Sequence, residues 1–326
     1  MKISEIIERR TPDWRELESD LSWMRNRRRS ELDSARVAAF ARRYRAVCSD
    51  LSLAISMRFP EGTTRYLHQL VAEAHTQLYR SESFRIGNWL TSLFVEVPSR
   101  ILRDPCTWIA FFLFWSLFLG SLAAAALRPD FAVAVVGEST LSNMDSMYAQ
   151  PIGEKAEADS RAVMTGFYVF NNAGIGLKCF ASGIFLGVGS LITLAFNAIF
   201  LGAIFGHMLT SPAADNFRDF VTAHGPFELT AVVLSAAAGL RLGWAILDTK
   251  GWSRAESLRR TGPRTLEMAG VATILFLLAA YIEGFFSPLY IAYEYKFAMA
   301  IGTSLILIFY IGILGLNNRG RRSDAA

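Results

Sequence analysis

The pattern of apolar positions changes at about residue 105 of the 326-residue chain. Before that point, apolar residues recur every three or four positions, which is the spacing of amphipathic helices packed against one another. After it come long uncharged apolar runs, several of which are long enough to cross a bilayer. The pattern predicts an all-α protein: a helical domain over 1–105, a transmembrane domain over 106–317 and a tail over 318–326.

Three amphipathic helices are predicted before the first span. One begins at Thr11, a good N-cap that is followed by Pro12; a second follows Ser30, and a third follows Pro60. Their apolar stripes are typical of a small helical bundle. From 88 to 104 the chain is amphipathic again, and we expect a juxtamembrane helix on the cytoplasmic surface of the membrane.

The apolar runs predict a polytopic bundle of about six spans. Four segments cross once each: 107–127 and about 227–247, 268–287 and 297–316. The stretch 175–209 forms either two short, Gly-rich spans or a re-entrant hairpin that is shielded by protein. Small residues allow helices to approach closely, and we expect this packing role for Gly183, Gly187, Gly202, Gly206, Gly239 and Gly243.

The distribution of charge predicts the orientation of the spans. Five basic residues lie in the loop over 248–264 and three lie in the tail, whereas 128–165 carries six acidic and three basic residues. Basic loops favour the cytoplasm, so both termini are expected inside the cell and 128–165 outside. No secretory signal opens the sequence. We therefore expect a multi-pass protein of the cytoplasmic (inner) membrane.

Composition supports the membrane class and narrows the chemistry. Hydrophobic residues make up 52% of the chain, which is too apolar for an ordinary soluble domain. The three cysteines, Cys48, Cys106 and Cys179, lack the spacing of a zinc site or of a disulfide framework. No nucleotide or nucleic-acid module is visible. The lipid bilayer is therefore the first expected partner, and neither nucleic acid nor a cofactor is expected.

Polar residues are predicted to gather near the outer ends of the spans. A carboxylate in hydrocarbon is costly, so Glu228, one turn into its span, requires a partner. His224, four residues earlier, shares a helix face with it, and Gly225 allows a sharp turn between them. The expected cluster comprises Asn171, Asn172, Lys178, His224, Gly225, Glu228 and Glu283.

Three roles are open for this cluster. In a structural role, His224 and Glu228 clamp their span against Asn171 and Asn172, at the end of an interfacial helix, and against Glu283. The second role is catalysis or metal binding, and the third is a translocation pathway. The sequence has no HExxH, no GxSxG and no paired intramembrane aspartates. We therefore assign no catalytic residue and no metal ligand.

Four segments stand out when they are taken together: "NNAGIG", the Gly-rich double segment, "HGPFELTAVVLSAAAGLRLG" and "IEGFFSP". Over about residues 100–316 they resemble the stage II sporulation protein M family of integral membrane proteins. The N-terminal region looks like that of the longer members. The sequence departs from the family pattern at Ala198, where Gly after Asn is common, and at His68, where Asn is expected.

The resemblance implies a helical inner-membrane protein that works in a complex and has no assigned enzymatic activity. Longer relatives tend to be encoded beside AAA+ ATPases of the MoxR group, which suggests such an ATPase as a partner; sporulation itself is not implied. The leading hypothesis is a non-enzymatic membrane scaffold or accessory subunit that binds other membrane or cytoplasmic proteins or forms a homo-oligomer. A transporter component and an intramembrane hydrolase are the alternatives.

Overall fold

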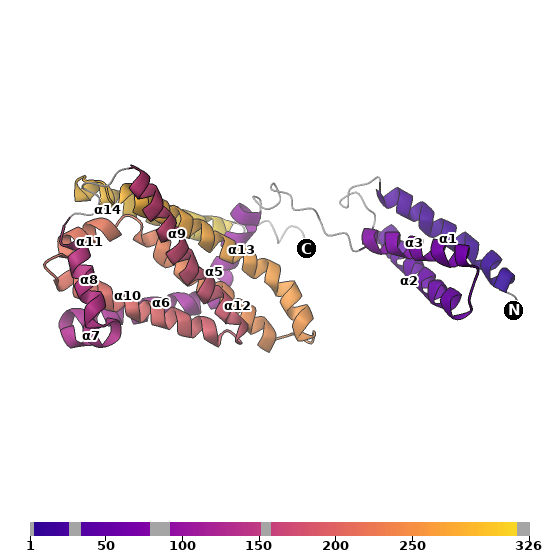
Figure 1. Cartoon of the computed structure of the whole chain (residues 1–326), viewed down its shortest axis with the longest axis horizontal. Coiled ribbons are helices and arrows are strands. Elements are labelled where there is room, and N and C mark those ends of the chain that lie inside the picture. The colour runs from indigo at the N-terminus through magenta and orange to yellow at the C-terminus, as the bar shows by residue number, and fades with distance from the viewer. Residues whose placement is uncertain (1–2, 26–33, 79–91, 151–157, 318–326) are drawn as a thin grey trace. The chain divides into compact units, whose positions relative to one another are not determined.

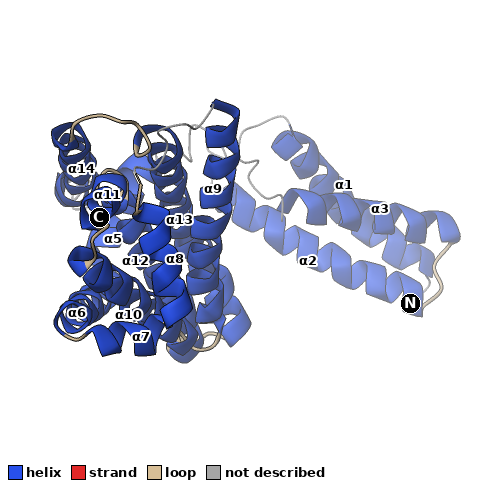
Figure 2. Cartoon of the chain, turned by 60° about the vertical axis from the view of Figure 1, so that its left-hand side comes forward, coloured by secondary structure: helices blue, strands red, loops and turns tan. Residues whose placement is uncertain are grey.

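The computed structural model describes residues 3–25, 34–78, 92–150 and 158–317, and these residues form helices and no β-strand (Figures 1 and 2). They divide into two compact units, unit 1 over Met1–Arg85 and unit 2 over Ile86–Ala326. Each unit has a hydrophobic core of its own. The all-α class that the apolar spacing predicted is therefore confirmed.

Unit 1 consists, in its described part, of α1 (Ile3–Arg25), α2 (Ser34–Ser56) and α3 (Glu61–Leu78). The apolar stripes of the helices meet in a core, where Leu17, Val47 and Leu67 are completely shielded from solvent. Ion pairs tie α1 to α2 at the edge of this core, because Arg10 Nε donates to Asp50 Oδ1 at 3.0 Å and Arg43 Nη1 donates to Asp20 Oδ2 at 2.6 Å. These charged pairs are typical of a water-exposed bundle.

The start of α1 differs from the prediction. The helix begins at Ile3, with Pro12 inside it, and the Thr11 hydroxyl donates to the Ile7 carbonyl at 2.6 Å instead of capping a new helix. Proline removes one helical hydrogen bond, but the preceding turns are held by buried Ile6 and by the Arg10–Asp50 pair. The predicted start of the second helix, Ser30, lies outside the described residues, and α3 follows Pro60 as predicted.

Within the described residues of unit 2, five helices are long and apolar enough to cross a membrane, and the protein is a multi-pass membrane protein. α12 (Gly225–Leu247) is central, since every residue from Ala231 to Leu240 is buried. The others are α6 (Pro105–Leu127), α10 (Val188–Thr210), α13 (Arg254–Tyr281) continued by the π-turn η4 (Ile282–Phe286), and α14 (Tyr293–Leu307) continued by η5 (Ile308–Leu314) and α15 (Gly315–Asn317).

α9 (Ala158–Ala181) runs alongside these helices, although it is less apolar. Near its start Thr165 contacts Gly284, in its middle Gly176 meets Phe276 of α13 and Ser235 of α12, and it ends at the short 3₁₀ turn η3 (Ser182–Ile184) before α10. Two predictions are corrected by this helix. Asn171 and Asn172 do not end an interfacial helix, and 175–209 holds the end of α9, a turn and a full 23-residue α10 rather than two short spans or a re-entrant hairpin.

The six glycines singled out for packing lie where backbones meet. A Cβ added to Gly202 would lie 2.4 Å from the Phe118 carbonyl, and one added to Gly206 would lie 2.3 Å from the Leu122 carbonyl, so both allow α10 to pack on α6. The other four meet one another: Gly239 and Gly243 of α12 pack on Gly183 and Gly187 at the α9–α10 turn. Only glycine permits this approach, and Gly187 also has a φ of 80°.

The segment before the first span belongs to unit 2. It forms the π-turn η2 (Ser92–Glu96) and α5 (Val97–Arg103), and Val97 and Ile101 are buried in the core of unit 2. Arg100 pairs with Glu267 of α13, and the Tyr310 hydroxyl donates to the Leu93 carbonyl at 2.7 Å. The division between the units therefore falls about 20 residues before the boundary at 105 that the apolar pattern suggested.

Three short helices cover one end of unit 2: α7 (Pro129–Val136), α8 (Glu138–Tyr148) and α11 (Ala214–Val221). Figure 1 shows them at the left of the unit, near the start of α14. Tyr148 and Phe217 stack edge to face with ring centroids 5.1 Å apart, and Asn216 donates to the Tyr148 carbonyl at 2.9 Å. We call this the α8–α11 end; it also holds the first turn of α12 and the last turn of α10.

Candidate functional site

The first turn of α12 places His224 and Glu228 on one face. His224 precedes the helix, its carbonyl accepts from the Glu228 amide at 3.2 Å, and Pro226 occupies a first-turn position that needs no amide hydrogen. Residues four apart face the same side of a helix. The His224 Nε2 atom accordingly lies 3.6 Å from Glu228 Oε2, which is longer than a hydrogen bond.

Glu283 reaches the same point from a different element. It lies on η4, the π-turn at the end of α13, and is only 9% exposed. Its Oε2 accepts from Asn172 Nδ2 at 3.3 Å, and Asn171 Nδ2 donates to Asn172 Oδ1 at 3.1 Å. The π-turn approaches α9 closely, since a Cβ on Gly284 would lie 1.8 Å from the Thr165 hydroxyl oxygen.

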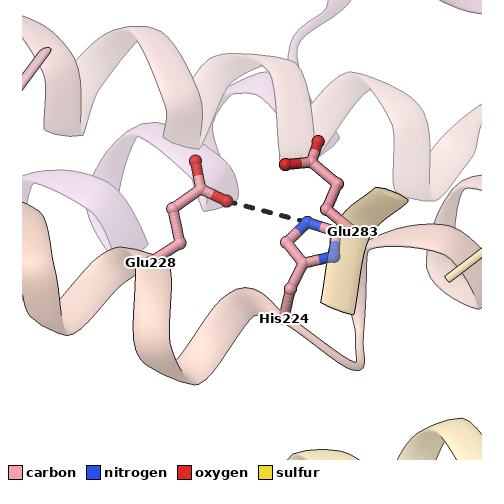
Figure 3. Close-up of side chains that lie close together, drawn as sticks. All are labelled: His224, Glu228 and Glu283. Atoms are coloured by element: carbon pink, nitrogen blue, oxygen red, sulfur yellow. Dashed lines mark ion pairs between the residues drawn. The ribbon is translucent and has the colours of Figure 1, made fainter. Parts of the chain in front are cut away.

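Ligand atoms of three side chains converge in this way. One atom each from His224, Glu228 and Glu283 lies within 4.8 Å of the others. Figure 3 shows the imidazole and both carboxylates pointing toward one another from two elements that are far apart in the sequence. We call these three residues the His-Glu-Glu cluster. By chemistry, such a set can bind a metal ion, share a proton or fix helix register.

A second layer of polar groups surrounds the cluster. The Ser287 hydroxyl lies 3.0 Å from His224 Nδ1, and the Ser287 carbonyl accepts from Lys296 Nζ at 3.0 Å. Lys296 is 2% exposed and also pairs with Asp219 of α11. Sequence reasoning missed Ser287, Lys296 and Asp219. The available signals were the Ser-Pro pair after "IEGFF" and a lysine at the start of an apolar run.

Burial governs the electrostatics at this end of the bundle. It lowers the pKa of His224, which precedes the span, to about 4, so the imidazole is neutral at neutral pH. Burial, followed by the charge of Glu283, raises the pKa of Tyr148 above its ordinary value. Among the described residues, no lysine or arginine pairs with Glu228 or Glu283. The two carboxylates therefore lack a compensating cation from the described protein.

Two of the residues predicted for the cluster differ from expectation. Lys178 is exposed in the last turn of α9, next to Cys179, whose carbonyl approaches Gly239. Gly239 lies 15 residues after His224, which is on the order of 20 Å along α12. Lys178 was placed wrongly because α9 continues past the asparagines. Gly225 has no positive φ and has open space around its Cα, so no sharp turn requires it.

A separate polar pair links α8 to α10. His207 Nε2 lies 3.0 Å from Asp145 Oδ2, and the Ser211 hydroxyl donates to Asp145 Oδ1 at 2.5 Å. Burial opposes ionisation of Asp145, but these two hydrogen bonds outweigh it and hold the Asp145 pKa below its ordinary value. His207 thus pairs with Asp145 and does not belong to the His-Glu-Glu cluster.

Comparison with known proteins places the cluster within a recognised region. The model of the family described as Stage II sporulation protein M matches residues 108–288, more than half of the chain, and these residues include all three cluster side chains and Ser287. A second model, described as Domain of unknown function (DUF8413), matches residues 4–80, which lie in unit 1. An uncharacterized protein of Methanocaldococcus jannaschii, MJ0793, is 28% identical over 123 residues, covering 36% of this chain and 67% of that protein. No solved structure matches the chain.

Proposed function

Because the chain belongs to the stage II sporulation protein M family, we propose that it is a non-enzymatic membrane scaffold, an accessory subunit of a multi-protein complex. The observation that carries the proposal is the division into two units with separate cores. Unit 2 holds the protein in the bilayer. Unit 1 has a compact, charged bundle outside the spans and supplies a domain for binding another protein.

Unit 1 also offers an apolar surface for such binding. Leu53, Ile55 and Met57, near the end of α2, are 40%, 54% and 39% exposed. Leu53 and Met57 are four positions apart and share one face, whereas Ile55 points to another side of the helix. Exposed apolar side chains on a water-facing bundle favour contact with a protein partner.

α9 runs from its contact with Gly284 at the α8–α11 end to its contact with Gly239, deep in α12, so four helices (α6, α9, α10 and α12) separate unit 1 from the basic loop over 248–264. An even number of crossings puts the two on one side, and the basic loop favours the cytoplasm of a cell with an inner membrane, where an AAA+ ATPase of the MoxR group is a candidate partner.

The helices of unit 2 favour a scaffold over a transporter component. Transporters place broken helices at mid-depth around their substrate. Here α6, α10 and α12 each run for 23 residues, and the π-turn η4 lies at the α8–α11 end rather than at mid-depth. Close glycine contacts lock α12 against its neighbours, as suits a rigid anchor.

The test is capture of partners from native membranes. Full-length tagged protein is cross-linked in cells, extracted in mild detergent, and its co-purifying chains are identified and quantified. We expect one or more specific proteins whose yield falls at least several-fold in the Ile55→Asp variant. Arg45→Asp, an exposed change elsewhere on α2, is the matched control and should retain them.

Recovery of equal amounts of every protein with both variants would argue against binding through this surface of unit 1. Substrate uptake into vesicles by the purified protein alone would favour the transporter alternative and contradict the scaffold proposal.

A further inference from the structure

The geometry points to a binding site for a divalent transition-metal ion, with zinc as the best match, formed by His224, Glu228 and Glu283. One imidazole nitrogen and two carboxylate oxygens are ligand types that zinc accepts. They come from the start of α12 and from η4, and Glu283 lies 55 residues beyond Glu228 in the sequence. A bound ion would join these elements at the α8–α11 end.

The distances between the three ligand atoms suit binding of one shared ion better than hydrogen bonds between the side chains. His224 Nε2 and Glu228 Oε2 are 3.6 Å apart, and all three ligand atoms lie within 4.8 Å of one another. Two ligands of a tetrahedral zinc ion lie roughly 3.3–3.6 Å apart, because each metal–ligand bond is about 2.0–2.2 Å long. The His–Glu separation is thus near a tetrahedral edge, and a small side-chain movement brings Glu283 into range.

The surroundings orient the ligands. A metal-binding histidine usually hydrogen-bonds through its second ring nitrogen, which fixes the ring and directs the other nitrogen at the metal. His224 Nδ1 has this partner in the Ser287 hydroxyl at 3.0 Å, and Nε2 points at the carboxylates (Figure 3). Asn172 holds one oxygen of Glu283 in the same manner, at 3.3 Å.

Charge balance supplies an independent reason. Buried carboxylates are stable when they are paired, protonated or bound to a metal. The described residues provide no lysine or arginine for Glu228 or Glu283, and the nearby Lys296 is paired with Asp219. A divalent ion would neutralise both carboxylates.

The protein does not fully enclose the cluster. The Glu228 side chain is 21% exposed, whereas that of His224 is 5% exposed. The cluster lies in the first turn of a span, near the end of the bundle rather than at its centre. Three protein ligands leave a fourth zinc position for water.

The test uses full-length protein purified in detergent, treated with a chelator, and then dialysed. We expect it to take up about one zinc ion per chain and to give the visible absorption bands of tetrahedral cobalt when Co²⁺ replaces zinc. Zinc should also raise the midpoint of thermal unfolding, because a ligand that binds the native state stabilises it.

Variants separate the cluster from adventitious binding. His224→Gln and Glu283→Gln should lose the zinc ion, the cobalt bands and the thermal shift. Ser287→Ala should weaken zinc binding by about 10–100-fold, while it retains the Lys296 contact, which is made by the main-chain carbonyl. His207→Gln, which removes the histidine of the Asp145 pair, is the control and should bind zinc as the wild type does.

Three results would overturn the site. One is a wild-type protein that binds no zinc. Another is a His224→Gln variant that binds zinc as the wild type does, while His207→Gln loses zinc binding. The third combines two observations: zinc does not change the stability of the wild type, and the zinc-free Glu283→Gln variant is more stable than the wild type. That result would mean that the two glutamates share a proton instead of binding an ion. Thermal unfolding of each zinc-free variant shows whether it folds. If a ligand variant does not fold, Ser287→Ala still tests the site, because it leaves all three ligands in place.

Discussion

At the scale of single residues, the α8–α11 end depends on a buried lysine that sequence reasoning missed. Lys296 is nearly inaccessible and joins Asp219 of α11 to the Ser287 carbonyl. Because Ser287 in turn contacts His224, one cation supports the residue that orients the His-Glu-Glu cluster. The lysine is thus a positioning residue, whereas Lys178 faces outward.

Replacing this lysine should destabilise the protein. In Lys296→Met, Asp219 loses its cation and the Ser287 carbonyl loses a donor, so we expect a loss of about 1–3 kcal/mol in the free energy of unfolding. The loss is below that for a fully buried pair because the Asp219 side chain is 36% exposed and can hydrate. Thermal unfolding in detergent measures it. Lys250→Met, an exposed change, is the control, and equal stability of both variants would contradict the assignment.

The Asp145 pair should make stability depend on pH. The pKa of Asp145 is lowered in the folded protein from an ordinary value of 3.8, so its contribution is present above the unfolded pKa and is lost as the pH falls through the folded value. We expect Asp145→Asn to be less stable than the wild type at neutral pH, with the difference shrinking below about pH 4. A difference that is constant over this range would show that charge is not involved.

At the scale of elements, the closest helix contacts are made at glycines. A Cβ on Gly243 would lie 1.9 Å from the Gly187 backbone nitrogen, and the contact involves backbone atoms that cannot rotate away. Gly270 of α13 has nothing within 4 Å of the same position. Gly243 and Gly270 both lie in long helices, but only Gly243 packs against the backbone of another element.

We expect Gly243→Ala to destabilise unit 2 by about 1–3 kcal/mol through overpacking. Gly270→Ala should be neutral or stabilising by up to about 1 kcal/mol, because alanine favours helix. Thermal unfolding of both variants in the same detergent measures the difference. An equal effect at the two positions would argue against the close contact of α12 with the α9–α10 turn.

At the scale of the whole molecule, the two cores predict that unit 1 folds alone. A fragment over 1–85 should be helical by circular dichroism and unfold cooperatively. Val47→Asp places a charge in a fully shielded position and should destabilise the fragment by several kcal/mol, about the cost of an unpaired buried charge. Leu53→Asp, at a 40% exposed position, should leave it folded. A disordered wild-type fragment would mean that unit 1 needs unit 2 or a partner.

We predict the orientation of unit 2 from the basic loop over 248–264, because basic loops favour the cytoplasm. A single cysteine introduced at Ser146, exposed on α8, into a variant without the three native cysteines should react with an impermeant maleimide on intact cells. A cysteine at Arg259, exposed on α13, should react only after permeabilisation. The reverse pattern would invert the proposed topology.

Local patterns were sufficient to predict the helical class and the four single spans, because periodicity and span length are properties of neighbouring residues. The resemblance to the stage II sporulation protein M family is confirmed by the match over 108–288. His224 and Glu228 could be paired in advance, since four-residue spacing on a helix brings side chains together. The start of α1 was missed because tertiary contacts hold the turns before Pro12.

Only the tertiary structure decided which distant residues meet. Glu283 lies 55 residues beyond Glu228, and its approach depends on the π-turn η4 and on Gly284 packing against Thr165. Asn171 and Asn172 were predicted to end an interfacial helix, yet α9 continues through them to the point where Gly176 packs against Phe276 and Ser235. That continuation carries Lys178 away from the cluster. Glycines marked packing faces in the sequence, but which helices meet has no local signature, and that choice determined the composition of the site.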